Sequence, residues 1–455
     1  MKNASQFTKS RTLEKRVPRY TSYPPANHFN GSVNADCMAG WLAAAPAASR
    51  ISLYVHIPFC RDLCWFCACR TQGMRRRIDP LDHYIEVLKS EIDMVAGLLD
   101  PSVVIESLHL GGGTPTLLPP PLMADLLNHL KSRFRFDKDY DLAVEIDPTE
   151  IDQSRMDVLI EAGLSRVSVG VQDFSPLIQK AIGRPQSFGQ TKDCFDMLRA
   201  GQVNSINIDL LYGLPHQTPT SFGNTLEKVL ALDPDRVAMF GYAHVPWMAP
   251  RQKLIDDATL PDGAARYMLL EKGRQLFAGH GYEPVGIDHF AKPQDQLVRA
   301  MRDGLLRRNF QGYTDDQSRF LIGLGASAIS RLPQGYAQNA GGTQAYLQMI
   351  RSGTLAISRG HRFSEEDQLH GYVIEQLMCQ FGISLDDIRQ RFDSLAKQLC
   401  CDIARNANKI GLERIDDDTA CDVYAITEAP HLRARLVAQY FDQYVTSEKS
   451  HSLAV

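Results

Sequence analysis

The sequence predicts an α/β protein with a partial (β/α)6-type, TIM-like barrel followed by a small, mostly helical C-terminal domain. Three observations predict this fold. Short apolar strands alternate with amphipathic stretches, one face of several strands is polar, and the pattern changes after about residue 335. The chain has 455 residues, which is enough for one large domain and a smaller one.

Six segments have the period-two alternation or the apolar composition of strands. They are residues 51–57, 103–110, 142–146, 166–172, 206–210 and 236–243. Amphipathic stretches between them, such as 84–99, 121–134 and 221–232, predict helices. Repeated strand–helix–strand units predict a parallel sheet with helical crossovers.

The strands carry polar residues at alternate positions. A parallel strand buried on both faces would be apolar throughout. Here Tyr54, Glu145, Gln172 and Asp209 fall on the face opposite the apolar residues of their strands. We expect helices to cover the apolar face and the polar face to line the interior of an open barrel. The alternative is that each polar residue stands at a strand end that faces water.

Three parts of the chain are expected. Residues 1–48 would fold over the mouth of the barrel, residues 49–335 would form the barrel, and residues 336–455 would form the mostly helical domain. The alternative for the N-terminal part is a disordered leader. From Arg362 onward the chain has sixteen acidic and ten basic residues. A nucleic-acid-reading module should be basic, so nucleic acid is excluded as a partner.

The overall composition is that of an ordinary globular protein. Hydrophobic residues make up 44% and charged residues 22%, and the net charge is −4. No apolar run reaches the roughly 18 residues that a membrane span needs. The first twenty residues lack the apolar core of a signal peptide. We therefore expect a cytoplasmic protein without a membrane span, and a monomer by default.

Four of the ten cysteines fall within ten residues. They are Cys60, Cys64, Cys67 and Cys69, directly after the first strand. Thiolates at such short spacings suit an iron–sulfur cluster. Three of them could hold three corners of a four-iron cube and leave the fourth iron open. A zinc site with Cys69 as the fourth ligand is the alternative. The other six cysteines are expected to be small buried residues.

A glycine-rich segment follows the second strand. It reads Leu-Gly-Gly-Gly-Thr-Pro over residues 110–115 and includes Gly112, Gly113 and Thr114. Glycines let the backbone approach a ligand closely, although any tight turn can also use them. The carboxyl edge of barrel strands is where active sites form. The segment therefore predicts a ligand contact beside the cysteine loop.

The Cys-x3-Cys-x2-Cys motif at the end of a first barrel strand resembles that of the radical S-adenosylmethionine superfamily. The resemblance implies a 4Fe-4S cluster on Cys60, Cys64 and Cys67, with Phe66 just before the third cysteine. It also implies that the open iron binds S-adenosylmethionine, that one electron cleaves it to a 5′-deoxyadenosyl radical, and that the glycine segment binds its amino end.

Further segments resemble one family within that superfamily. They are residues 18–24, 145–148, 170–174, 207–215, 242–246, 288–291, 308–313 and 326–330. Together they resemble the oxygen-independent coproporphyrinogen III oxidases, from about residue 16 to about residue 340.

The resemblance implies a set of contacts to S-adenosylmethionine, of which two molecules are expected. Glu145 is also expected to take part in catalysis, and Gln311 and Ile329 to lie near the second molecule. The implied contacts are Tyr54, Phe66, Gly112, Gly113, Thr114, Glu145, Gln172, Arg184, Asp209, Ala243, Gln311 and Ile329.

The implied reaction converts two propionates of coproporphyrinogen III to vinyl groups without oxygen, giving protoporphyrinogen IX in anaerobic haem biosynthesis. It needs an electron donor and an electron acceptor, neither of which the sequence identifies. Arginines suit the carboxylates of this substrate, and Arg19, Arg184 and Arg307 or Arg308 are candidates.

Three other functions compete with the oxidase. A haem-binding chaperone of the same family would keep the cluster without oxidase activity, but Cys69 and residues 20–24 favour the oxidase. An iron–sulfur regulator would not need the glycine segment. A zinc-bound structural protein is the remaining alternative.

Overall fold

The computed structural model describes residues 17–74, 79–415 and 422–445. Its main feature is a twelve-stranded sheet in the order β16-β15-β14-β13-β1-β4-β5-β6-β7-β8-β10-β9. Six neighbouring strands from β1 to β8 are parallel. They are β1 (Arg50–Ile57), β4 (Val104–Gly112), β5 (Arg135–Ile146), β6 (Leu164–Gln172), β7 (Ser205–Tyr212) and β8 (Arg236–Gly241).

Shorter strands extend the sheet at both sides. Beside β1, β13 is parallel and β14, β15 and β16 are antiparallel. Beside β8 lie β10 and β9, both antiparallel. Because β16 and β9 are the two edges, the ladder does not close on itself, which confirms the partial barrel. These strands are β9 (Glu283–Val285), β10 (His289–Ala291), β13 (Leu321–Leu324), β14 (Ile329–Leu332), β15 (Gly335–Asn339) and β16 (Ile357–Arg362).

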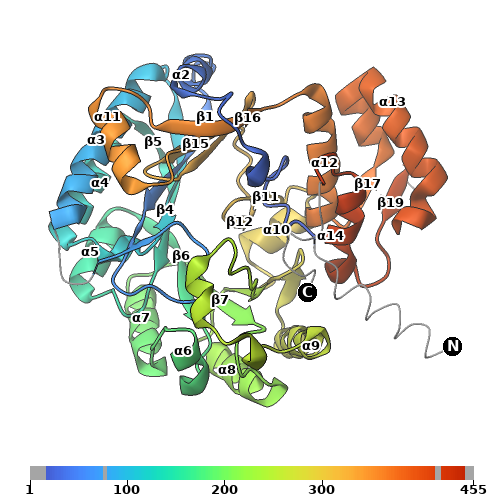
Figure 1. The fold of residues 1–455 in the computed structure, drawn as a ribbon, viewed down its shortest axis with the longest axis horizontal. Coiled ribbons are helices and arrows are strands. Elements are labelled where there is room, and N and C mark those ends of the chain that lie inside the picture. Colours follow the sequence, from blue (N-terminus) through green and yellow to red (C-terminus); the bar gives the residue numbers. More distant parts are fainter. Residues whose placement is uncertain (1–16, 75–78, 416–421, 446–455) are drawn as a thin grey trace.

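Helices cover the outer face of the parallel strands, as Figure 1 shows. The apolar residues of β1, Ile51, Leu53, Val55 and Ile57, are fully or almost fully buried in the core beneath them. The polar residues that alternate with them lie on the opposite face of the strand, toward the barrel interior, as the sequence alternation predicted. The helices of this part of the chain are α2 (Ala35–Ala43), α3 (Asp79–Leu98), α4 (Pro120–Arg133), α5 (Gln153–Glu161), α6 (Pro176–Ala181), α7 (Phe188–Ala200), α8 (Pro219–Ala231), α9 (Gly263–Gly279), α10 (Gln296–Arg302) and α11 (Thr343–Arg351).

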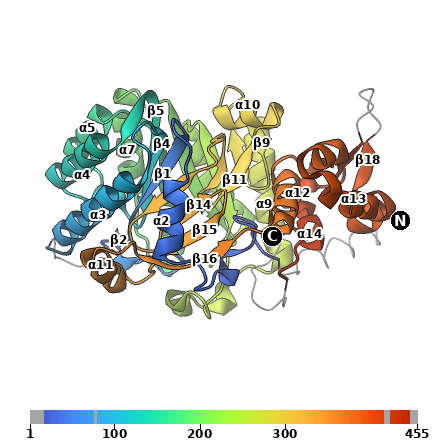
Figure 2. The ribbon, with the colours of Figure 1, turned by 90° about the horizontal axis from the view of Figure 1, so that it is seen from above.

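A second apolar core lies among the C-terminal helices, beside the barrel (Figures 1 and 2). A small three-stranded sheet, in the order β17-β19-β18, completes this part. The elements are α12 (Glu365–Cys379), β17 (Gly382–Ser384), α13 (Leu385–Ile410), β18 (Glu413–Ile415), β19 (Val423–Ala425) and α14 (Pro430–Tyr440). The large sheet continues to residue 362, and the division of the chain at residues 48 and 335 stays a prediction.

The N-terminal segment, residues 17–24, runs between the barrel and this second core. Arg19 Nη2 donates to the carbonyl oxygen of Gly241 at the end of β8, at 2.7 Å. The Tyr20 hydroxyl donates to Asp442 Oδ2 at 3.0 Å, just beyond α14. The segment therefore connects the carboxyl edge of the barrel to the C-terminal helices.

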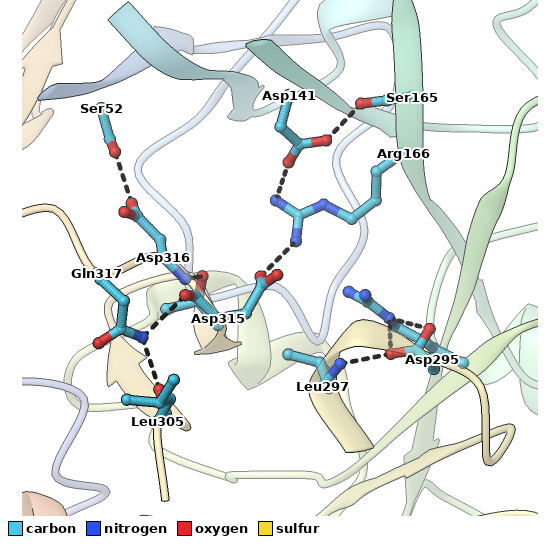
Figure 3. Close-up of polar contacts among 12 residues, drawn as sticks. Ser52, Asp141, Ser165, Arg166, Asp295, Leu297, Leu305, Asp315, Asp316 and Gln317 are labelled. Carbon is cyan, nitrogen blue, oxygen red and sulfur yellow. Dashed lines mark hydrogen bonds and ion pairs between the residues drawn. The ribbon is translucent and has the colours of Figure 1, made fainter. Parts of the chain in front are cut away.

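Polar contacts close the amino-terminal end of the barrel (Figure 3). Arg166 on β6 pairs with Asp141 on β5 at 2.9 Å and reaches Asp315 at 4.0 Å. Ser52 on β1 donates to Asp316 at 2.6 Å. The segment at residues 315–316 therefore lies across the strand starts. No helix within the described residues is long and apolar enough to cross a membrane.

Candidate active site

The cysteine loop is held at both ends by backbone hydrogen bonds. Its start, β2 (Phe59–Cys60), pairs in parallel with β3 (Gln72–Gly73). Gln72 donates to the Pro58 carbonyl and Met74 to the Cys60 carbonyl, both at 2.8 Å. The loop between these strands carries the other three cysteines.

The thiols of Cys60, Cys64 and Cys67 are close enough for their charges to interact. Burial raises the pKa of Cys60 to about 11. A hydrogen bond with Cys69 lowers the pKa of Cys67 to about 6. Within residues 17–74, 79–415 and 422–445, no three His, Cys, Asp or Glu side chains already stand at metal-binding distances. Each cysteine of a 4Fe-4S cluster binds a different iron, so a cluster does not require the three sulfurs to meet at one metal-binding point.

Arg184 connects the cysteine loop to the strand ends. Its Nη1 lies 3.4 Å from Cys64 Sγ and 3.0 Å from Asp147 Oδ2, and its Nη2 donates to the Gly170 carbonyl at 3.0 Å. Its Nε is buried and has no hydrogen-bond partner among the described residues. Burial alone would lower the pKa of Arg184, but Asp147 and Cys64 raise it above its ordinary value. A fixed positive charge thus faces the cysteine sulfur.

The glycine segment packs directly against the start of the cysteine loop. Gly113 donates to the Ile57 carbonyl and Thr114 to the Phe59 carbonyl, both at 2.8 Å. The Thr114 side chain also hydrogen-bonds the Cys60 thiol. A Cβ on Gly113 would lie 2.5 Å from the Phe59 carbonyl oxygen, so the close approach requires glycine.

Glu145 is the centre of a polar group on three neighbouring strands. Its Oε2 accepts from the Gly112 amide at 2.9 Å, and its Oε1 lies 3.4 Å from His109 Nε2. Burial would raise the pKa of Glu145, but His109 and the Gly112 amide lower it below its ordinary value. Tyr54 packs against His109 and bonds His56 Nδ1 at 3.0 Å. An ionised carboxylate therefore faces the glycine segment.

A cavity of about 130 Å3 lies in the barrel interior, with Glu145, Asp209 and Gln311 in its lining. Asp209 accepts from Ser168 Oγ and from Asn207 Nδ2, each at 2.8 Å. Burial and the nearby Glu145 charge raise the pKa of Asp209, and the two hydrogen bonds oppose that rise. Two of the four polar residues predicted to share a face therefore line one cavity.

The remaining predicted residues lie around this centre. Gln252 Nε2 donates to the Phe66 carbonyl at 2.8 Å and to the Ala243 carbonyl at 3.0 Å, so it joins these two segments. Gln172 ends β6 with a φ of 67°, beside Gly170. Ile329 begins β14 and is not among the described residues that line the barrel cavity.

Two residues of the site were not singled out from the sequence. His109 alternates with the apolar Leu108 and Leu110 on β4, so strand parity alone could have placed it beside Glu145. Gln252 lies in a 3-10 turn, η3 (Pro250–Leu254), and carries no periodic signal. Arg75, Arg76 and Arg77, a run of arginines that follows the cysteine loop in the sequence, lie outside the described residues.

Comparison with known proteins places this geometry in a family. The sequence pattern of the Radical SAM superfamily matches residues 54–229. The oxygen-independent coproporphyrinogen III oxidase of Paracoccus denitrificans is 48% identical over 455 residues, which covers 100% of both chains. The chain belongs to the oxygen-independent coproporphyrinogen III oxidase family.

Other oxygen-independent coproporphyrinogen III oxidases agree with this assignment. The anaerobic coproporphyrinogen III oxidase 1 of Cereibacter sphaeroides is 47% identical and covers 97% of each chain. The solved structure of the Escherichia coli enzyme, described as a radical SAM enzyme, has a TM-score of 0.88 and 35% identity. It covers 95% of this chain and 100% of its own.

The family implies a 4Fe-4S cluster and S-adenosylmethionine, and the site fits both. Cysteine thiolates are the ligands that such a cluster needs, and three of them share one clamped loop. The glycine segment brings its backbone against the start of the cysteine loop and the Glu145 carboxylate, and the buried Arg184 Nε is available as a donor.

Proposed function

We propose that this chain catalyses the oxygen-independent oxidative decarboxylation of two propionates of coproporphyrinogen III, giving the two vinyl groups of protoporphyrinogen IX. The observation that carries the proposal is the 48% identity to such an oxidase over the full length of both chains. The reaction serves haem biosynthesis without oxygen. The alternative of a haem-binding chaperone has no support among these relatives.

Cys60, Cys64 and Cys67 would hold the 4Fe-4S cluster and leave one iron for S-adenosylmethionine. When bound, these groups supply a 5′-deoxyadenosyl radical that removes hydrogen from the substrate. The Arg184 guanidinium beside Cys64 would stabilise negative charge on the cluster.

The other proposed residues bind and orient S-adenosylmethionine. Glu145 would accept hydrogen bonds from its amino group, because its carboxylate faces the glycine segment. Asp209 would accept from a ribose hydroxyl, while Tyr54, Gln172 and Thr114 would add polar contacts. Phe66 and Ala243 would pack against its adenine end, and their shared partner Gln252 keeps them together.

A second molecule of S-adenosylmethionine is part of the proposal, with Gln311 and Ile329 near it. Gln311 lines the same cavity as Asp209, which supports this role. For Ile329 the support is the sequence resemblance alone. Arg19, Arg184 and Arg307 or Arg308 are the candidates proposed to bind substrate carboxylates. The electron donor and acceptor are separate molecules, and a cytoplasmic, monomeric enzyme stays a prediction.

The test is an anaerobic turnover measurement. The protein is reconstituted with iron and sulfide, reduced, and mixed with S-adenosylmethionine and coproporphyrinogen III. We expect 5′-deoxyadenosine and protoporphyrinogen IX to rise together in the wild type and to vanish in Cys64→Ser. Cys401→Ser is the matched control, because Cys401 is exposed on α13, far along the chain from the cysteine loop.

Each other outcome points elsewhere. Formation of 5′-deoxyadenosine without vinyl product would support the radical chemistry and refute coproporphyrinogen III as the substrate. Stoichiometric haem binding by a protein that does not cleave S-adenosylmethionine would contradict the oxidase and favour the chaperone. Full activity in Cys64→Ser would refute the proposal that Cys64 is a ligand of the cluster.

A further inference from the structure

A second and larger cavity, of about 600 Å3, lies between the barrel and the C-terminal helices. Its volume is within the range of pockets that bind small organic molecules. The walls come from the N-terminal segment, the 304–308 stretch, β14, α12 and the start of α13. None of the residues proposed above to contact S-adenosylmethionine lines it.

The lining of this cavity is strongly positive. Among its described residues there are five arginines against two carboxylates, in a chain whose net charge is −4. The arginines are Arg307, Arg308, Arg319, Arg331 and Arg391. Such an excess in one concave surface favours an anionic ligand.

The two carboxylates are already engaged. Burial would raise the pKa of Asp367, but hydrogen bonds from His361, Ser364 and Tyr444 hold it at about 2. Glu375 pairs with Arg307, at 3.2 Å between Oε1 and Nε. The two acids of the cavity therefore do not balance the charge of its five arginines.

The Arg308 guanidinium has hydrogen-bond donors without partners among the described residues. Its side chain is only 6% exposed, and its nearest ion pair, with Asp288, is long at 3.9 Å. Its Nε and Nη1 are buried without a hydrogen-bond partner among the described residues. Buried guanidinium donors without partners are costly, so a ligand oxygen that reached them would gain free energy.

The rest of the lining suits a flat apolar body. Among the described residues, six aromatic side chains line the cavity with the arginines: Tyr20, Tyr23, Tyr336, Phe363, Tyr372 and Phe392. Arg391 stacks on Tyr372 at 4.8 Å, and Arg331 contacts the Tyr336 hydroxyl. Arginines and aromatic side chains in one cavity match a large ring with carboxylates at its edge.

We propose that this cavity is a binding site for a tetrapyrrole polycarboxylate, separate from the barrel cavity. The inference rests on the proposed function, which supplies the ligand class. The hairpin of β11 (Arg307–Asn309) and β12 (Gly312–Thr314) connects the two cavities, because Arg308 lines one and Asn309 and Gln311 line the other. The site holds the tetrapyrrole outside the barrel, on the far side of that hairpin.

The experiment measures binding of coproporphyrin III, the stable oxidised form of the substrate, to the full chain by fluorescence titration. The first variant combines Arg319→Gln with Arg391→Gln, since both residues are exposed and their loss should leave the fold intact. The second is Arg331→Gln. The matched control is Arg405→Gln, an exposed arginine further along α13 that does not line the cavity.

We expect each cavity variant to bind coproporphyrin III about tenfold more weakly, or worse, because each removes at least one charge-assisted contact. Arg405→Gln should bind as the wild type does. Circular dichroism shows whether Arg331→Gln is folded. If it is not, the binding result of the Arg319→Gln, Arg391→Gln double variant alone tests the proposal.

Two results would overturn the proposal. One is unchanged binding in the double variant. The other is displacement of the porphyrin by citrate at equal concentration, which would make the cavity a general anion site. Neither result bears on the oxidase itself, whose failure would appear as absent vinyl product in the turnover measurement.

Discussion

The two oxygens of Glu145 have different partners, the Gly112 amide and the His109 ring. This division fixes the direction of the carboxylate without neutralising it, since its pKa stays below the ordinary value. Gly112 completes the arrangement with a φ of 110°, in the region that favours glycine. The local chemistry thus depends on the negative charge of Glu145 and on the absence of a side chain at Gly112.

Replacing Gly112 with alanine should abolish most S-adenosylmethionine binding. A Cβ there would lie 2.4 Å from the His56 ring, and the backbone would be strained by roughly 1–3 kcal/mol. Equilibrium dialysis with the reconstituted protein measures the effect. Gly97→Ala on α3 is the control, because nothing lies within 4 Å of its added Cβ. Equal affinity in Gly112→Ala and wild type would refute the proposed role.

Replacing Glu145 with glutamine should weaken S-adenosylmethionine binding about tenfold or more. The amide keeps the shape but removes the charge that attracts an ammonium group. The same dialysis measurement applies, with Glu86→Gln on the exposed face of α3 as the control. Unchanged affinity in Glu145→Gln would remove this residue from the site.

At the scale of elements, one buried acid connects α3 to the far part of the sheet. Glu91 Oε2 accepts from the Gly325 amide and the Tyr346 hydroxyl, each at 2.7 Å, and Oε1 accepts from Asn339 at 2.6 Å. Gly325 follows β13, which pairs with the cluster strand β1. Helix α3 therefore positions the segment after β13, which lies beside strand β1 and its Tyr54.

The pH dependence of stability should carry the signature of Glu91. Burial raises its pKa to about 7, above the ordinary 4.5. Between these values the folded state keeps a proton that the unfolded chain releases, so stability falls as pH rises. The slope is about 1.4 kcal/mol per pH unit over that window.

Chemical denaturation of wild type and Glu91→Gln between pH 4.5 and 7 measures this difference. The stability of the variant relative to wild type should increase with pH. A constant difference across the window would mean that Glu91 titrates near its ordinary value in the folded protein.

At the scale of the whole molecule, residues 17–24 connect the two cores. Arg19 reaches β8, while Tyr20 and Tyr23 are buried in the C-terminal core. The Tyr23 hydroxyl accepts from the Gln443 amide at 3.1 Å. A segment near one end of the chain thus joins the barrel to the last helices.

Tyr20→Phe should loosen this connection by about 1 kcal/mol, because Asp442 Oδ2 loses the hydrogen bond from the Tyr20 hydroxyl. The rate of limited proteolysis at the C-terminal helices should rise, while Tyr440→Phe, at an exposed ring, should change nothing. Identical cleavage rates in Tyr20→Phe and wild type would show that the hydroxyl contributes nothing to docking.

Sequence periodicity predicted the six parallel strands and the polar face that Glu145 and Asp209 share. It missed the strands of three to five residues from β9 to β15, which are too short to show a period. It also missed the arginine-rich cavity, because Arg331 and Arg391 meet only through packing between α12, α13 and the sheet. The roles of the cluster cysteines and of Ile329 remain predictions from resemblance.

The backbone hydrogen bonds that hold both ends of the cysteine loop have a consequence for how the protein responds to oxygen. The β2–β3 pairing and its flanking hydrogen bonds involve backbone atoms only, so they do not depend on iron. Oxygen that destroys the cluster should therefore leave a folded polypeptide with its loop anchored at both ends. We expect such a chain to accept a new cluster when iron and anaerobic conditions return.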